Sequence, residues 1–501
     1  MLFWGSGKKR WAVALVAAML AGSMGTSAAR QASREELEDR IRRLEQIIRD
    51  AGLDQPAARK AVRSSATAGG KPATVAAEPA PNKEEVEALV EEKLRKQKVL
   101  AGWKDGFFLE SPNGDFKLKL RGYLQADARF FPLESGDTGT DSFFLRRVRP
   151  IVEGTVYKYF DFKIMPDFGQ GSTVLQDAYA RINYWPYAQI QAGKWKSPFS
   201  LERLQGGDNL TFIERSIANN LAPNRDVGVA LGGGVLADRI NYQFGVFNGS
   251  GDGQLNDGDV TSDKDFAGRV FVEPFKVDGP DPVKGLGVGF AATYGTARDE
   301  SYSGVQYKTA GRSNFFKFNT PTGTAVNFNG SRTRFAPQAY YYWGPFGLMG
   351  EYINNDEELE QIVTPKTGAP AITDTHFKPS GWFLQASYVL TGEDATYKQV
   401  VPINNFDPAN GRWGAFEAAF RVSEVDIEDN IFREGFAKRT GATSSAVAYT
   451  GGLNWYFNKN FKLQLNWEHT EFDNNITYSG HFGNHTRNHE DVFLSRFQIA
   501  Y

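Results

Sequence analysis

Polar and apolar residues alternate through Lys117–Phe130, and this alternation predicts a long β-strand. Successive side chains of a strand point to opposite faces, so a period of two separates the residues onto two faces. Lys117, Lys119, Arg121 and Arg129 fall on one face, whereas the other face is apolar. The stretch exceeds an ordinary strand of ~5–6 residues and suits a tilted transmembrane strand. It therefore predicts the wall of a transmembrane β-barrel, with lipid outside and a cationic, water-filled lumen.

Strand-like segments continue to the end of the chain, and about sixteen of them can be counted. An even number is usual for an antiparallel barrel of the bacterial outer membrane. The expected strands after the first are Phe143–Thr155, Tyr159–Phe168, Gln176–Trp185, Tyr187–Lys196, Val227–Leu236, Arg239–Asn248, Phe266–Glu273, Leu286–Gly295, Arg332–Trp343, Phe346–Ile353, Gly381–Leu390, Arg412–Val425, Ala446–Phe457, Phe461–His469 and Asp491–Tyr501. The sequence thus predicts an all-β fold, a sixteen-stranded antiparallel transmembrane barrel.

The connections between these strands alternate in length. If both ends of the barrel sequence are periplasmic, the periplasmic turns are mostly short and the outer loops mostly long, as in Thr296–Ser331 and Asn354–Phe377. That is the usual arrangement in outer-membrane barrels. Thr391–Gly411 is a long connection on the periplasmic side, and we expect it to fold into the lumen from below.

The residues before the barrel divide into four segments. Basic residues followed by an apolar run and small residues predict a signal peptide over residues 1–29. A capping box and a heptad seam then predict a periplasmic coiled-coil helix over residues 30–53, or an amphipathic helix lying on its own barrel. Residues 54–82 have the composition of a flexible linker, residues 83–103 predict a second periplasmic helix, and residues 104–501 form the expected barrel.

Composition and motifs narrow the function. The net charge of −2 gives no reason to expect a nucleic-acid partner, and the absence of cysteine fits export to an oxidising compartment. No nucleotide-binding, hydrolase or metalloprotease motif is present, and we expect no cofactor or metal. His481, His485 and His489 have a spacing that could ligate zinc, and the acidic stretch Gly251–Asp265 invites a calcium site. A polar loop and an acidic surface loop, one that would repel anions at the mouth, are the simpler interpretations.

Several phrases resemble the phosphate-selective porin O and P family. They are Phe143–Pro150, Gly193–Glu202, Phe212–Ser216, Gly381–Glu393 and Gly414–Ser423, in the family's order. The resemblance implies a homotrimer of sixteen-stranded barrels in the outer membrane of a Gram-negative bacterium, passing inorganic anions such as phosphate or polyphosphate. In some members an N-terminal coiled-coil arm is present. The alternating aromatic end at Tyr501 also looks like the strand signal read by the barrel assembly machinery.

An anion pore needs fixed positive charge at its narrowest point, where guanidinium groups can replace lost hydration. The resemblance places the family's arginine pair at Arg146 and Arg147, although Arg146 is off the alternating pattern unless a bulge turns it inward. Strand parity and a looser match add further candidates. The complete set of expected pore-lining or anion-binding residues is Arg121, Arg146, Arg147, Arg149, Asp177, Arg181 and Lys119.

The connection Ser197–Asp226 is long enough to fold inward and narrow the pore. It contains Arg203, Arg215 and Arg225, together with four acidic residues. Phosphate-selective members of the family carry a lysine deep in this loop, and this chain has none there. Without this lysine we still expect selectivity for anions, but a preference for phosphate is in doubt.

Other functions fit the same pattern less well. A porin with a preference for organic acids, sugars or cations, with the coiled coil as a periplasmic tether, is the main alternative. A barrel lipase or protease would need a nucleophile beside a base, and His469 has no evident serine partner. An adhesin or cell-wall tether would use the coiled coil as its functional part.

Overall fold

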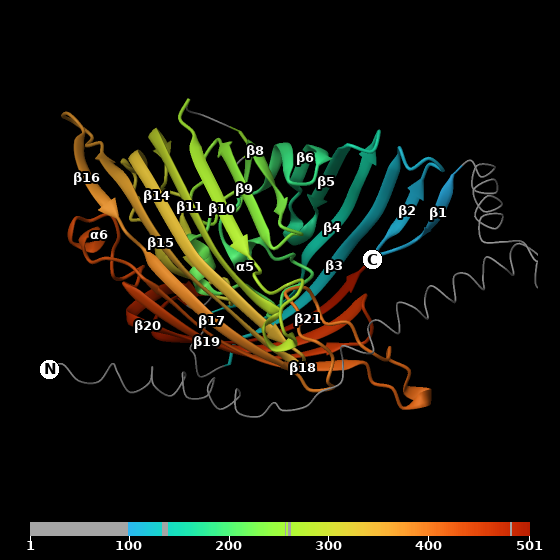
Figure 1. The fold of residues 1–501 in the computed structure, drawn as a ribbon. Coiled ribbons are helices and arrows are strands. Elements are labelled where there is room, and N and C mark those ends of the chain that lie inside the picture. Colours follow the sequence, from blue (N-terminus) through green and yellow to red (C-terminus); the bar gives the residue numbers. More distant parts are fainter. Residues whose placement is uncertain (1–98, 133–138, 256, 259–261, 481–482) are drawn as a thin grey trace, which may run out of the picture. The chain divides into compact units, whose positions relative to one another are not determined.

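The computed structural model describes residues 99–132, 139–255, 257–258, 262–480 and 483–501. The predicted signal peptide, coiled coil and linker, and nearly all of the predicted second helix, lie outside these residues. In the described part sixteen long strands follow one another around a closed antiparallel barrel (Figure 1). None of the helices in this part is long and apolar enough to cross a membrane.

The barrel strands follow the chain order. They are β3 (Lys117–Phe130), β4 (Ser142–Val156), β5 (Phe160–Asp167), β6 (Val174–Trp185), β7 (Ala188–Lys196), β8 (Arg225–Val235), β9 (Ile240–Phe247), β10 (Asp265–Val272), β11 (Gly285–Ser301), β14 (Thr324–Trp343), β15 (Phe346–Val363), β17 (Ser380–Val389), β18 (Ala415–Asp426), β19 (Ser445–Tyr456), β20 (Phe461–Gly480) and β21 (Gly483–Ala500). Each pairs with the next, and β21 pairs with β3 to close the ring. Gly122 and Tyr501 exchange backbone hydrogen bonds of 2.8 Å at this seam.

The alternation that predicted the strands also sets the two faces of the wall. Apolar side chains such as Phe143, Val229, Phe244 and Phe290 are strongly exposed on the outside, as a lipid-facing surface requires. Their neighbours in sequence point inward and are mostly small or polar, such as Ala230, Gln243 and Ala291. The expected sixteen-stranded barrel is therefore confirmed.

Two parts of the wall differ from the sequence prediction. Leu100–Trp103, at the end of the segment predicted as a helix, forms β1 and makes a hairpin with β2 (Phe107–Glu110), which pairs with β3. At the opposite end, β14, β15, β20 and β21 run well beyond their expected bounds, and β16 (Ala371–Phe377) pairs with the extension of β15. Apolar residues of these extensions, such as Val326, Phe328 and Leu359, are buried in an apolar core, so the lipid-facing pattern that marks a membrane strand does not mark them.

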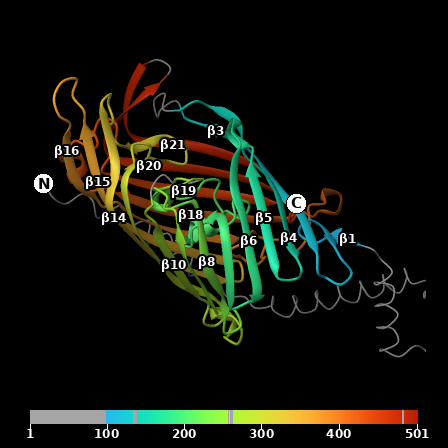
Figure 2. The same cartoon turned by 90° about the horizontal axis from the view of Figure 1, so that it is seen from above.

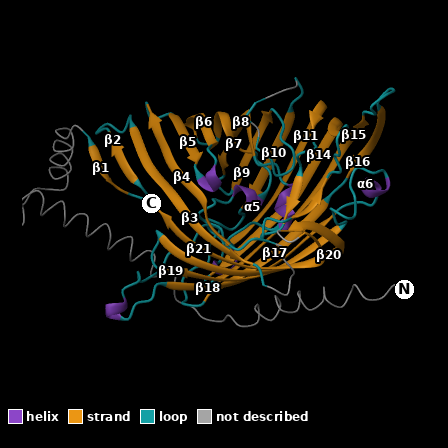
Figure 3. Ribbon diagram, turned by 180° about the vertical axis from the view of Figure 1, so that it is seen from behind, coloured by secondary structure: helices purple, strands orange, loops and turns teal. Residues whose placement is uncertain are grey.

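Two connections fold into the barrel, and part of a third reaches the first of them from the end with the short turns (Figure 2). The inner loop, residues 197–224 between β7 and β8, contains α5 (Leu201–Leu204) and η3 (Ile217–Leu221), and its helices lie among the strands in Figure 3. The outer insert, residues 302–323, carries the hairpin β12 (Gln306–Lys308) and β13 (Asn314–Lys317). The lower insert, residues 390–414, contains η5 (Pro408–Asn410).

Short helical turns complete the described elements: η2 (Gly169–Gly171), η4 (Asp281–Val283) and α6 (Asn430–Arg433). The largest apolar core lies inside the barrel, where fully buried Tyr307, Phe315 and Phe316 of the outer insert pack against Phe377 and Phe436. This core fills the lumen beside β14–β20 at the end with the long loops. The remaining open space is consequently displaced toward β4–β10.

Candidate functional site: a cationic path beside the inner loop

The inner loop is fixed to one side of the barrel by lumen-facing polar side chains. Its backbone carbonyl groups between Gly207 and Ile213 accept hydrogen bonds from Lys462, Gln464 and Arg496 of β20 and β21, at 2.7 to 3.1 Å. The Ile213 amide donates to Asn466 at 2.7 Å. Carbonyl and amide groups that would be costly to bury unpaired are thus satisfied by the wall. The prediction that this loop folds inward is confirmed.

A second set of contacts holds the start of the same loop. The carboxylate of Glu351 on β15 accepts hydrogen bonds from the Ser200 hydroxyl and the Leu201 amide, both at 2.8 Å, at the first turn of α5. From below, the Tyr397 hydroxyl of the lower insert donates to the Leu201 carbonyl at 2.6 Å, and the Tyr397 carbonyl accepts from Gln205 at 2.7 Å. The expected inward fold of Thr391–Gly411 is therefore confirmed for its first part, around Tyr397, whereas Val401, Ile403 and η5 are exposed.

Three cavities follow the remaining side of the lumen, between the inner loop and the inner face of β4–β10. The outer cavity, about 240 Å³, borders the outer insert. The middle cavity is about 350 Å³, and the lower cavity is about 500 Å³ and reaches the short turns at Pro186 and Asp238. The middle and lower cavities share Gln191, Leu204 and Gln243. Together they mark a polar path along one wall.

Basic side chains outnumber acidic ones in each cavity. The outer cavity is lined by six basic and two acidic residues, the middle one by four and two, and the lower one by three and one. The basic residues are Arg146, Arg147, Arg203, Arg215, Lys308 and Arg312 in the outer cavity, Arg121, Lys163, Lys196 and Arg225 in the middle one, and Arg181, Arg269 and Lys276 in the lower one. Fixed charge of one sign along a narrow path selects counter-ions of the other sign.

Arg146 enters this path through a β-bulge. Gln125 pairs with Arg147 while Ala126 pairs with Leu145, so Arg146 is the extra residue of β4. Its guanidinium group donates to both carboxylate oxygens of Glu214 in the inner loop, at 2.5 and 3.1 Å. The charge of Arg146 is therefore largely neutralised by Glu214.

Arg147 has a different environment from its neighbour. It is buried beneath the inner loop and donates to the side-chain oxygen of Gln125 at 2.7 Å, and among the described residues it makes no ion pair. The loop passes so close that a Cβ atom at Gly207 would lie 2.8 Å from the Tyr123 hydroxyl and 3.4 Å from Arg147 Cδ. Arg147 thus adds a full positive charge to the outer cavity.

Arg203 and Arg215 of the inner loop also keep their charge. Arg203 donates to the Asn219 carbonyl at 2.7 Å, and Arg215 donates to the Glu202 and Gln205 carbonyls at 2.9 and 2.8 Å. Burial, together with the charge of Arg215, lowers the pKa of Arg203 to about 9, so this side chain is still cationic at neutral pH. Burial likewise lowers the pKa of Arg215 to about 10.

The acidic residues of the outer cavity are already paired. Burial alone would favour the neutral acid, yet Arg146 holds the pKa of Glu214 well below its usual value. Asp252 pairs with Arg334 at 3.0 Å and accepts from Asn355 and from the Tyr307 hydroxyl. Neither carboxylate is therefore free to repel an anion in the cavity.

Pairing with basic residues of the wall also explains why so many acidic residues occur in Gly251–Asp265. Asp252 and Asp265 are buried beside Arg334 and Arg332, and Asp257 pairs with Lys194. The expectation of an acidic surface loop is wrong for Asp252 and Asp265, because these residues neutralise wall arginines from inside the barrel. No group of His, Asp or Glu in the described residues is placed to hold a metal ion, and the side chains of His481 and His485 lie outside that part.

The remaining sequence candidates are spread along the path. Arg121 pairs with Glu153 at 2.8 Å and lines the middle cavity, where Asp177 accepts from Lys163 and Arg225, each at 2.7 Å. Arg181 lines the lower cavity and pairs with Asp161 at 2.8 Å. Two candidates are not among the residues lining these cavities: Arg149, which pairs with Asp167 at 2.7 Å, and Lys119.

Several lining residues were not selected from the sequence. Lys308 and Arg312 carried no signal, because their positions depend on which loops enter the lumen. Lys196 and Arg269 lie on wall strands, and the parity of β10 could have identified Arg269 as facing inward. Arg203 and Arg215 stood out only as basic residues of a loop with balancing acids. Which acids are already bound to other groups could not be read from the sequence.

Comparison with known proteins identifies the family. The family model described as phosphate-selective porin O and P matches residues 116–500. Porin O of Pseudomonas aeruginosa is 27% identical over 422 residues, which cover 79% of this chain and 91% of that protein.

Solved structures of other barrels are less similar. The outer-membrane channel DcaP of Acinetobacter baumannii has a TM-score of 0.47 and 10% identity, covering 80% of this chain and 100% of that one. An anion-selective porin from Comamonas acidovorans has a TM-score of 0.45 and 12% identity, covering 77% and 100%. At TM-scores below 0.5 neither neighbour bears on function. On the match of the family model over most of its length, this chain belongs to the phosphate-selective porin O and P family and is an outer-membrane porin of a Gram-negative bacterium.

Proposed function

We propose that the protein is a passive channel for small anions, phosphate and related oxyanions among them. The observation that carries this proposal is the outer cavity, where six basic residues face two carboxylates that are both engaged in ion pairs. Guanidinium groups bind oxyanions through geometrically matched pairs of N–H donors. Donors spread over three consecutive cavities offer weak, successive sites, which a conducting pore requires.

The residues expected from the sequence, Arg121, Arg146, Arg147, Arg149, Asp177, Arg181 and Lys119, have different roles in this proposal, and Lys119, which lines none of the three cavities, has none. Arg147 contributes uncompensated charge, together with Arg203, Arg215 and Arg312. Arg121, Arg146, Arg149 and Arg181 are paired with carboxylates and chiefly order the wall and the inner loop. Asp177 holds Lys163 and Arg225 in position. The proposal therefore assigns selectivity to a smaller set than the sequence did.

This chain lacks the loop lysine of the phosphate-selective relatives, but another basic residue supplies a positive charge in the same part of the lumen. Arg312 of the outer insert lines the outer cavity, and its side chain is exposed to it. A guanidinium of this kind stays charged at neutral pH. We propose that Arg312 and Arg203 supply the charge that a loop lysine would otherwise bring.

The test is planar-bilayer conductance of the purified protein in a KCl gradient, followed by titration with phosphate. We expect an anion-selective reversal potential and a current that phosphate reduces. Arg312→Gln should weaken the effect of phosphate about fivefold, as expected for loss of a ~1 kcal/mol contact in water. Arg439→Gln is the matched control, because Arg439 pairs with Asp429 on an exposed loop between β18 and β19. A cation-selective potential would contradict the proposal.

Assembly belongs to the same proposal. We expect a homotrimer embedded in outer-membrane lipid, inserted by the barrel assembly machinery through the C-terminal strand, with residues 30–53 as a periplasmic coiled coil. Light scattering of the detergent-solubilised full chain, compared with a chain lacking residues 30–53, measures the subunit number. A monomer in both preparations would contradict the trimer.

A further inference from the structure

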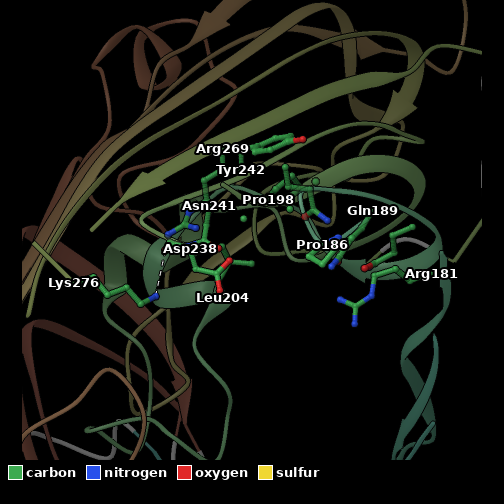
Figure 4. Close-up of a pocket in the computed structure, with 15 residues that line it drawn as sticks. Arg181, Pro186, Gln189, Pro198, Leu204, Asp238, Asn241, Tyr242, Arg269 and Lys276 are labelled. Carbon is green, nitrogen blue, oxygen red and sulfur yellow. Dashed lines mark hydrogen bonds between the residues drawn. The ribbon is translucent and has the colours of Figure 1, made fainter. Parts of the chain in front are cut away.

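The lower cavity has a chemistry that simple anion conduction does not require. It is the largest of the three cavities, about 500 Å³, and lies beside β6–β10 near the short turns at Pro186 and Asp238 (Figure 4). Ligand pockets of about 300–1,000 Å³ accommodate organic molecules, whereas a bare tetrahedral oxyanion is far smaller. The size alone leaves room for more than phosphate.

Glycine residues open this cavity. The pairing register places Gln189 of β7, Gly232 of β8 and Gln243 of β9 side by side across the wall, and Arg269 of β10 follows beside Gln243. Gly232 and Gly234 lie on the inward side of β8 and contribute no side chains. The wall is therefore hollowed between the polar side chains of β7 and those of β9 and β10. Pro198 and Leu204 of the inner loop border this hollow.

Three side-chain amides face this hollow. Gln189, Gln191 and Gln243 line it, and among the described residues none of their side-chain atoms makes a hydrogen bond. Each amide presents two N–H donors and one carbonyl acceptor. A fully ionised oxyanion can use the donors and has nothing to offer the acceptors. Hydroxyl groups satisfy both, because a hydroxyl donates one hydrogen bond and accepts others.

Basic groups stand at the two sides of the amides. Arg269 on β10 has its guanidinium 4.6 Å from the ring centre of Phe271 and donates through Nε to Gln338, without an ion pair in the described part of the chain. Arg181 on β6 lies at the other side, at the right of Figure 4, and its partner is Asp161. Lys276 is bound to Glu273 and the Asp238 carbonyl. Arg269 is thus the cation best placed to receive a ligand anion.

We propose that the lower cavity is a binding site for hydroxylated organic phosphates, of the sugar-phosphate or polyol-phosphate class. The phosphate group binds Arg269, and the hydroxyl groups exchange hydrogen bonds with Gln189, Gln191 and Gln243. This site deepens the proposed function, since it rests on an anion-conducting pore and names a class of solute. Inorganic phosphate alone leaves the amide acceptors unmatched.

The experiment uses glucose 6-phosphate, added to the periplasmic side of single channels in KCl. Inorganic phosphate and uncharged glucose are the comparison solutes, and the concentration that halves the current is measured for each. The test variant is Gln189→Met with Gln243→Met, which removes two amides and keeps the side-chain size. The matched control is Gln399→Met, a half-buried amide in the lower insert that donates to the Lys459 carbonyl and is not among the residues lining the three cavities.

In the wild-type channel, glucose 6-phosphate should act at a lower concentration than either comparison solute. The double variant should raise its half-blocking concentration about tenfold, from the loss of two hydrogen bonds, and leave that of phosphate unchanged. Arg269→Met should weaken glucose 6-phosphate by a similar factor, and Gln399→Met should change nothing. If the double variant does not insert with wild-type conductance, Gln243→Met alone serves with a smaller expected change.

Two results would overturn this site. Equal potency of glucose 6-phosphate and phosphate in the wild type would show that hydroxyl groups add nothing. Equal potency of glucose and glucose 6-phosphate would remove the role of Arg269. The reversal potential of the same channels in KCl alone tests the anion porin separately, so failure of the sugar-phosphate site and failure of the porin are distinguishable.

Discussion

Arg146 and Arg147 are adjacent in β4, but replacing each by glutamine should affect different properties of the protein: the order of the inner loop for Arg146 and phosphate binding for Arg147. Arg146 is in a bidentate pair with Glu214 of the inner loop, whereas Arg147 has only the amide oxygen of Gln125 as its partner. Both line the outer cavity, so Arg146→Gln and Arg147→Gln each remove one positive charge from it. Their effects on the protein differ because one substitution leaves a buried carboxylate unpaired and the other does not.

The magnitudes follow from the contacts. Removing one partner of a buried ion pair costs about 3–5 kcal/mol, and Arg496, 3.9 Å from Glu214, remains to reduce that cost toward 3 kcal/mol. Arg147→Gln leaves no carboxylate behind, so the fold should keep its stability. At contact distance a unit charge is worth ~1 kcal/mol in water and ~4 kcal/mol at an effective dielectric constant of 20. Taking the lower value for a water-filled cavity, phosphate block should weaken five- to tenfold.

Hydrogen exchange of the inner loop and bilayer recording separate the two effects. In Arg146→Gln the amides of residues 203–216 should exchange faster, whereas in Arg147→Gln they should keep wild-type protection while phosphate block weakens. The double variant Arg146→Gln/Glu214→Gln removes both charges and should restore the protection lost in Arg146→Gln. Equal loss of protection in Arg147→Gln and Arg146→Gln would refute the distinction between paired and unpaired arginines.

Three further outcomes are expected. Tyr397→Phe deletes the hydrogen bond to the Leu201 carbonyl, which is worth about 1 kcal/mol, and should increase open-channel current noise by loosening α5; unchanged noise would count against support from below. Asp252→Asn leaves buried Arg334 with Glu357 as its remaining close partner, and this loss should destabilise the outer insert by about 3 kcal/mol. The destabilisation should be seen as faster proteolysis of residues 302–323. Asp429→Asn at the exposed rim is the control and should not change the rate of proteolysis. Because Arg146 holds the pKa of Glu214 below its usual value, the pair contributes stability above about pH 4.3 and loses it as the pH falls further. Glu214→Gln should therefore leave the pH dependence of inner-loop hydrogen exchange unchanged between pH 5 and 8, and a transition in that range that this variant removes would contradict the assignment.

The wall of the barrel was predictable because half of each strand must face lipid. Expected and observed strands agree closely at the ends with short turns, as at Phe346 and Phe461, where alternation begins at once. Agreement fails beyond the membrane. The extensions of β14, β15 and β20 bury apolar residues such as Phe328, Leu359 and Phe472 in the core formed with loops that enter the barrel, so the polar-inside, apolar-outside pattern of a membrane strand does not mark them.

The site was predictable only in part. Parity and the family resemblance identified Arg147, and the bulge at Arg146 was stated as a condition that the pairing register now meets. The charge available to an anion depends on which carboxylates lie near each arginine. Glu214 is 68 residues from its partner Arg146, and Asp252 is 82 residues from Arg334. Such pairings are fixed by the folding of loops into the lumen, which local sequence patterns do not specify.

The arginines of this barrel fall into two groups: those paired with carboxylates, which stabilise the fold, and those without such partners, which can attract anions. Arg332, Arg334, Arg421 and Arg496 are almost wholly buried beside the core or the inner loop, and each has at least one carboxylate partner. Placed there without partners, these cations would carry a large desolvation penalty, and fully paired they add little field to the lumen. Arg147, Arg203, Arg215, Arg269 and Arg312 have no carboxylate partner among the described residues, and all five line cavities, where water can solvate them until an anion arrives. A buried cation without a fixed counter-ion is stabilised where solvent or a solute can replace that counter-ion, so these five arginines mark the conducting path.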